Sequence, residues 1–144
     1  MTPESVPDPA RVGRALTKRA WVLPGAPASP PQVAATAFLL ERPQDGRELS
    51  ASLDLAGLFR RFRRLFGLAV LRAGDVRGCC LPDGSPAGLE VLHTPDESDP
   101  HHVSLTGMPS AAERGADDAA AQRAYDIAEA LAAHAALILS PPTE

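Results

Sequence analysis

The chain has 144 residues, a formal net charge of −4 and 44% hydrophobic residues, the composition of a single soluble domain. No stretch approaches the roughly 18 consecutive apolar residues of a membrane span, and the first residues are too polar for a secretion signal. We therefore expect no membrane contact and a cytoplasmic location.

Residue usage indicates the source of the chain. One Lys stands against thirteen Arg, Asn is absent, and Ala, Gly and Pro are abundant. These residues have G/C-rich codons, so we expect a bacterial protein from a high-GC genome. Aromatic residues make up 4% of the chain, so its core must be built mainly from Leu, Val and Ala.

Prolines dominate the first 35 residues. Proline has no backbone N–H and biases the preceding residue away from the helix, so residues 1–35 are predicted to form an extended arm. The single tryptophan, Trp21, lies in this arm within a short apolar run, and it can pack on the protein's own domain or anchor a partner. The prolines of the arm are Pro3, Pro7, Pro9, Pro24, Pro27, Pro30 and Pro31.

A hairpin and a helix are predicted next. Residues 36–53 contain an Asp-Gly turn followed by alternating apolar and polar residues, the pattern of a β-hairpin. Residues 54–66 are predicted to be helical because apolar residues recur every three or four positions, with Asp54 or Ser52 as the capping residue. This periodicity places Phe62 in the buried stripe and Arg61 on the opposite, solvent-facing side.

The second half of the chain has the pattern of short strands followed by a helix. Close spacing favours an antiparallel order, since parallel neighbours need long crossovers. Residues 108–116 are predicted to form a loop, residues 117–138 a helix capped by Asp117, and residues 140–144 a tail. We predict an α+β fold in which one domain, residues 36–139, has five or six strands covered on one face by both helices. The predicted strands are residues 68–72, 76–81, 88–93 and 102–106.

Charge is divided between the two halves of the chain. Residues 1–72 carry eleven basic and six acidic groups, and residues 73–144 carry three basic and twelve acidic groups. Such asymmetry can attract a charged partner, so we interpret Trp21 and an arginine run as a surface for another protein. Two alternatives remain open, a solvated helix face and a nucleic-acid site, although the acidic net charge opposes the latter. The arginines are Arg60, Arg61, Arg63 and Arg64.

Three histidines suggest a second kind of site. If the strand ending at His93 pairs directly with the strand beginning at His102, their Cβ atoms lie about 5 Å apart. The connecting loop contains His101 and three carboxylates, and imidazole with carboxylate is a ligand set for divalent metals. The hypothesis is a metal or acid/base site at His93, His101 and His102. The alternative is a hydrogen-bonded pair of structural histidines.

Cys79 and Cys80 are the first candidates for a nucleophile. A reactive thiol needs a nearby cation, imidazole or helix N-terminus to lower its pKa. In a hairpin of residues 76–81 with 88–93, Cys79 and His93 would lie on the order of 10 Å apart, too far for a catalytic pair. The cysteines are therefore predicted to be structural residues of a strand.

Familiar phosphate-binding, dinucleotide-binding and nucleophile-elbow motifs do not occur in the sequence. We therefore expect a non-catalytic accessory or regulatory protein that binds another protein through its arm, Trp21 and the arginines. One alternative is a small metal-dependent or acid/base enzyme centred on the three histidines. The other is a nucleic-acid-binding module built on the arginine helix. Apart from a divalent metal in the enzyme alternative, no cofactor is expected.

Overall fold

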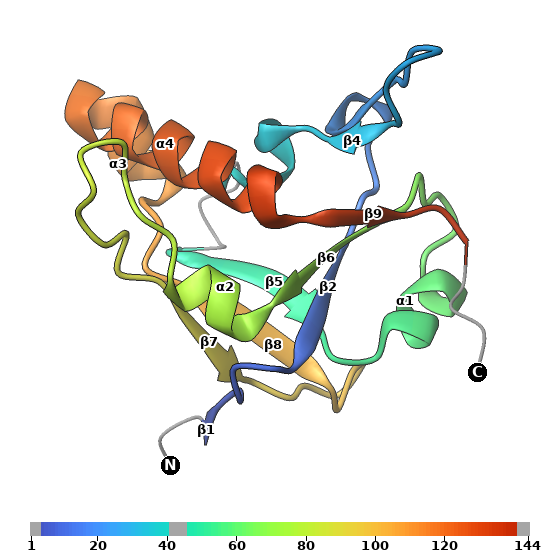
Figure 1. The fold of residues 1–144 in the computed structure, drawn as a ribbon. Coiled ribbons are helices and arrows are strands. Elements are labelled where there is room, and N and C mark those ends of the chain that lie inside the picture. The colour runs from blue at the N-terminus through green and yellow to red at the C-terminus, as the bar shows by residue number, and fades with distance from the viewer. Residues whose placement is uncertain (1–3, 41–45, 141–144) are drawn as a thin grey trace.

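The structure, a computed structural model, describes residues 4–40 and 46–140, and in this part seven of nine strands form one antiparallel sheet (Figure 1). The α+β prediction is confirmed, with more strands than the five or six expected. The order across the sheet is β1-β7-β8-β5-β2-β6-β9, and β3 pairs with β4 apart from it. The strands are β1 Glu4–Ser5, β2 Arg11–Ala15, β3 Val22–Leu23, β4 Gln32–Val33, β5 Glu48–Ser52, β6 Leu68–Arg72, β7 Glu90–His93, β8 His102–Thr106 and β9 Ala136–Ile138.

Four α-helices and two short 3-10 helices complete the described part of the chain, where the sequence predicts two helices. Asp54 and Asp117 cap α1 and α4 as predicted, because their carboxylates accept hydrogen bonds from backbone amides of the first turn. None of these helices is long and apolar enough to cross a lipid bilayer. The helices are η1 Arg19–Trp21, η2 Ala35–Phe38, α1 Leu55–Arg61, α2 Ala73–Arg77, α3 Ala111–Ala116 and α4 Asp118–His134.

The two faces of the sheet are covered unequally. Side chains alternate between the faces along each strand. The larger core lies on the face covered by α4, where strand residues such as Val103 join Ile127 and Leu131 of the helix. On the opposite face Leu58 of α1 packs with Leu68 of β6 in a second, small core. The two helices that were predicted to cover one face of the sheet therefore lie on opposite faces. On the face covered by α1, strands β5 and β8 carry polar side chains such as Ser50 and His102.

The proline-rich segment is not a separate arm. β2 lies inside the sheet between β5 and β6 and pairs with β6 along its whole length. Gly13 permits this arrangement, because a Cβ atom there would stand 2.5 Å from Leu55 Cδ2 of α1. Trp21 is 8% exposed and belongs to the larger core. The boundary predicted at residue 35 therefore does not separate an arm from the domain. The longest exposed run in the described part of this segment is residues 23–32.

The predicted hairpin of residues 36–53 is half correct. Its second strand is β5, but residues 35–38 form the 3-10 helix η2, and β5 pairs with β8 and β2 instead. Residues 41–45, which include most of the predicted turn, lie outside the described residues, as does the predicted tail from residue 141 onward. Pairing with strands distant in the sequence has overridden the local hairpin signal.

Three elements of the second half also differ from the prediction. Residues 73–77 form α2 where a strand was predicted from residue 76. The predicted loop 108–116 contains α3, which begins with a capping box between Ser110 and Glu113. The last helix, α4, ends before Ala135, and the following residues form edge strand β9 because they pair with β6.

Helix α1 is shorter than predicted and ends at Arg61. Phe62 has an extended backbone and is 40% exposed, so the prediction that it lies in the core is wrong. After the helix, the Phe66 amide donates to the Leu16 carbonyl, which joins this segment to the chain just after β2. The arginine run opposes a longer helix, since like charges three or four positions apart repel one another.

Candidate functional site

A groove of about 850 Å³ opens where β2 and β5 separate. Within the described residues the two strands pair only at Gly13 and Ser52. Beyond this pair, the chain of β2 continues toward Lys18 and β5 runs back to Glu48, and residues of both segments line the groove. The C-terminal part of α1 and the loop between β7 and β8 provide the walls.

The backbone of β5 turns an open edge toward this groove. In an antiparallel ladder, successive residues direct their N–H and C=O groups alternately to the two sides of the strand. The Leu53 amide donates to the His101 carbonyl, so every second residue before Leu53 bonds to β8. The backbone groups of Glu48 and Ser50 therefore point away from β8, into the gap beyond the Gly13–Ser52 pair.

Arg14 links the two strands where they have separated. Its Nε donates to the Ala37 carbonyl at 2.6 Å, and its Nη1 donates to the Ser50 carbonyl at 3.1 Å. The Arg14 guanidinium and the Lys18 ammonium each lie 5.2 Å from the centroid of the Trp21 ring, close enough for cation–π attraction. These contacts hold the Trp21 ring in place in the groove lining.

Apolar side chains make up one part of the lining. Trp21, Leu39 and Leu40 come from the segment after β2, while Leu58 and Phe62 come from α1 and its end. All of these except Phe62 are buried. Phe62 is a partly exposed aromatic ring in this lining, and it offers apolar surface to the side chain of a ligand.

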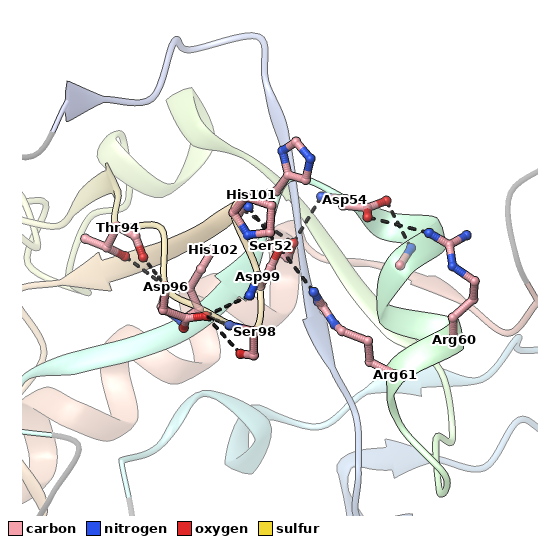
Figure 2. A network of polar contacts seen from close by, with 12 residues as sticks. Ser52, Asp54, Arg60, Arg61, Thr94, Asp96, Ser98, Asp99, His101 and His102 are labelled. Atoms are coloured by element: carbon pink, nitrogen blue, oxygen red, sulfur yellow. Dashed lines mark hydrogen bonds and ion pairs between the residues drawn. The ribbon is translucent and has the colours of Figure 1, made fainter.

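An ion pair joins the two walls of the groove (Figure 2). Arg61 Nη1 of α1 lies 3.1 Å from Oδ1 of Asp99 in the β7–β8 loop, and Asp99 is 5% exposed. Burial acts to raise the pKa of Asp99, but hydrogen bonds from Arg61, Ser52 and the His101 amide outweigh it, so this pKa lies below its usual value. Arg61, predicted to face solvent, is instead held by a buried carboxylate.

Asp96 organises the same loop and adds a negative charge to the groove. Its Oδ1 accepts hydrogen bonds from the Ser98 hydroxyl at 2.8 Å and from the amides of Ser98 and Asp99 at 2.9 and 2.8 Å. The Ser98 hydroxyl and these amides lower the pKa of Asp96. Its exposed carboxylate is therefore ionised at neutral pH.

His102 lies in the groove lining and is fixed by its neighbours (Figure 2). Its Nδ1 is 2.9 Å from both the carbonyl oxygen and the Oγ1 of Thr94, and Thr94 Oγ1 is 2.8 Å from Ser104 Oγ. Donation to the carbonyl oxygen requires a proton on Nδ1, which leaves Nε2 as the acceptor of the neutral ring.

The three histidines do not converge. His93 lies opposite Val103, one residue from the pairing with His102 that the sequence analysis assumed. A shift of one residue turns a side chain to the other face of the sheet, so His93 and His102 lie on opposite faces. His93 Nε2 contacts the Pro100 carbonyl at 3.0 Å, and His101 is exposed. Throughout residues 4–40 and 46–140, no three His, Cys, Asp or Glu side chains are grouped to hold a metal ion, so the predicted cluster is not formed.

The arginine run does not form one helix face. The Arg60 side chain is 71% exposed and lies 3.7 Å from Asp54, whereas Arg61 turns toward the groove. Arg63 and Arg64 follow the end of α1 and are exposed. Four arginines predicted to act as a single surface therefore have three different environments.

The cysteines lie away from the groove. Cys79 is buried in the larger core, as predicted for a structural cysteine, and Cys80 is exposed. Burial raises the pKa of the Cys79 thiol, which opposes formation of the reactive thiolate. Neither cysteine lines the groove.

Sequence reasoning missed the groove residues Arg14 and Ser50, and it considered Asp99 only as one of the carboxylates beside the histidines. The alternation of residues in β5 could identify Ser50 as part of a polar face. The separation of β5 from β2 has no local signal, because the two strands are distant in the sequence. The turn pattern Asp96-x-Ser98 could identify the loop, but not the arginine that reaches it.

Comparisons of the chain with models of protein families, with curated proteins and with solved structures find no match.

Proposed function

We propose that the protein is a non-catalytic accessory or regulatory protein that binds an extended segment of another protein in the groove between β2 and β5. The observation that carries the proposal is the β5 backbone at Glu48 and Ser50, which faces a groove of about 850 Å³ and pairs with no strand there among the described residues. The Ser50 carbonyl accepts from Arg14, so the Ser50 N–H is the group that a peptide would meet first. An extended peptide can add to such an edge through main-chain hydrogen bonds, while neighbouring pockets select its side chains.

The lining suits this mode of binding. Trp21 and Phe62 offer apolar surface for an anchoring side chain, and the Ser50 N–H is available to a peptide carbonyl. Aromatic anchors in a desolvated pocket contribute much of the affinity of protein interfaces.

The imidazole in the groove supports a binding role over an acid/base role. His102 Nδ1 is committed to Thr94, and the Thr94 hydroxyl is itself bonded to Ser104. A catalytic base would need a nucleophile or a substrate proton within about 3 Å of its free nitrogen. The bonded hydroxyls here belong to the network that holds the β7–β8 loop.

Selection from a displayed library of random peptides tests this function. Trp21 is the only tryptophan, so its fluorescence reports groove occupancy and gives the Kd of each selected peptide. Ser50→Pro removes the N–H that faces the groove and leaves the bonds from β5 to β8 in place. We expect this variant to bind about tenfold more weakly, because a main-chain hydrogen bond is lost and the ring obstructs the edge.

Ser50→Ala is the matched control, since it removes the hydroxyl and keeps the N–H. Its Kd should remain within about threefold of the wild-type value. Circular dichroism melting curves establish that both variants are folded. Selected peptides that bind folded Ser50→Pro as tightly as the wild type would contradict strand addition at this edge.

A further inference from the structure

We infer that the segment bound in the groove is acidic at one end, where it leaves the groove over three exposed arginines, two after the end of α1 and one in η1. We call Arg19, Arg63 and Arg64 the arginine platform. The inference rests on the proposed function, because the platform continues the wall of the same groove.

Backbone pairing places the platform beside the groove. Arg63 and Arg64 directly follow Phe62, which lines the groove. The Phe66 amide donates to the Leu16 carbonyl at 2.8 Å, which brings the segment after β2 against the segment after α1. Consequently, the Arg19 guanidinium lies 5.5 Å from the centroid of the Phe66 ring.

The platform carries positive charge that the described protein does not neutralise. Several other arginines are paired with carboxylates, as Arg47 is with Glu113 at 2.5 Å and Arg61 is with Asp99 at 3.1 Å. Within residues 4–40 and 46–140, the three platform arginines have no carboxylate at ion-pair distance. Guanidinium groups bind carboxylates through two parallel hydrogen bonds, so an acidic side chain complements this surface.

Carboxylates in the groove lining distinguish an acidic peptide from a nucleic acid. Asp96 and Glu48 are exposed and line the groove. A nucleic acid carries a negative charge at every phosphate, so a strand lying in the groove would bring phosphates against these two carboxylates. A peptide can place acidic residues only at the platform and neutral or basic residues elsewhere, which favours a peptide.

A pair of charge variants tests the inference. Arg63→Gln with Arg64→Gln removes two platform charges without introducing new ones. Arg11→Gln with Arg72→Gln is the matched control, because these exposed arginines face each other across β2 and β6 and lie outside the groove lining. Both double variants change the net charge equally, so any difference between them depends on position.

Peptides are selected from the same random library on the wild-type protein and on both double variants. We expect the wild type and the Arg11/Arg72 variant to enrich Asp and Glu at one end of the selected peptides, and the Arg63/Arg64 variant to lose this enrichment. Wild-type-selected peptides should bind the Arg63/Arg64 variant about three- to tenfold more weakly at low salt, given two exposed charge pairs. The difference should shrink at high salt.

The outcomes separate this inference from the function on which it rests. Peptides that require the Ser50 edge but show no acidic preference would overturn the inference and leave the groove function standing. Selection that yields no Ser50-dependent peptides would overturn both. A single-stranded DNA probe that binds the wild type and loses affinity in the Arg63/Arg64 variant, without any acidic peptide doing so, would assign the platform to nucleic acid and overturn the inference.

Discussion

Arg61→Ala should lower the free energy of unfolding by about 1–2 kcal/mol at neutral pH, although the sequence places Arg61 on the solvent side of a helix. The reason is Asp99, a carboxylate 5% exposed and 3.1 Å from the guanidinium. A hydrogen bond to a charged group contributes about 1.5–3 kcal/mol. Because the Arg61 side chain is 32% exposed, water compensates for part of the loss and the expected value is reduced.

The loss of stability in Arg61→Ala should depend on pH through Asp99. Burial acts to raise the pKa of Asp99, but the hydrogen bonds from Arg61 and its other donors outweigh this effect. The pKa of Asp99 in the folded protein therefore lies below its value in the unfolded chain. Such a group stabilises the fold fully above its unfolded pKa of about 3.9, and the contribution is lost as the pH falls through the folded pKa. The deficit of Arg61→Ala should therefore be present at neutral pH and shrink in acid.

Urea titrations followed by circular dichroism measure both effects. Arg60→Ala is the control, since its side chain is 71% exposed and lies 3.7 Å from Asp54, and it should cost less than about 0.5 kcal/mol. A double-mutant cycle of Arg61→Ala with Asp99→Asn should give a coupling energy of about 1–2 kcal/mol. Equal losses in the two arginine variants, or a loss that does not change with pH, would refute this reasoning.

Three other predictions follow from burial and charge. Phe62→Ala should cost less than about 1 kcal/mol and Leu58→Ala about 2–4 kcal/mol in a urea titration, because only the latter is buried. An NMR titration should place the pKa of Glu113 at about 2, and Arg47→Ala should move it upward by removing the main hydrogen-bond donor. A thiol reagent should label one cysteine rapidly in the native protein and reach buried Cys79 only in denaturant. Native labelling of both thiols would contradict the last of these.

Some elements could be predicted because local pattern and tertiary context agree. The strands at residues 68–72 and 102–106 have the predicted bounds, and Asp54 and Asp117 cap their helices as expected. Short apolar runs bounded by turn residues, and aspartate before a helix, are strong local signals. At these positions the pairing of strands in the large sheet agrees with the local sequence preference.

Other elements depend on contacts between distant segments. β2 contains two arginines and a glycine, which favour no strand locally, yet Gly13 is required where Leu55 of α1 packs on the backbone. The β7–β8 register is fixed by a hydrogen bond from the Thr94 amide to the His102 carbonyl. The shift of one residue that this bond imposes separates His93 from His102. No pattern within either strand predicts that shift.

The groove itself could not be predicted for the same reason. It arises because β2 and β5 pair at Gly13 and Ser52 and then separate, which is a property of two strands that lie far apart in the sequence. The sequence did single out Trp21, as a residue of an extended arm that could pack on its own domain or anchor a partner. Its ring packs in the domain core and forms part of the groove lining, close to two cations.

Amide hydrogen exchange at Ser50, followed by NMR, tests the central claim most directly. If an extended peptide adds to the open edge of β5, saturation with a selected peptide should slow exchange of the Ser50 amide by at least about tenfold. The Ala51 amide, which faces β8, should show a much smaller change because it is already in the ladder. Unchanged exchange at Ser50 under saturating peptide, with protection appearing elsewhere, would contradict the account.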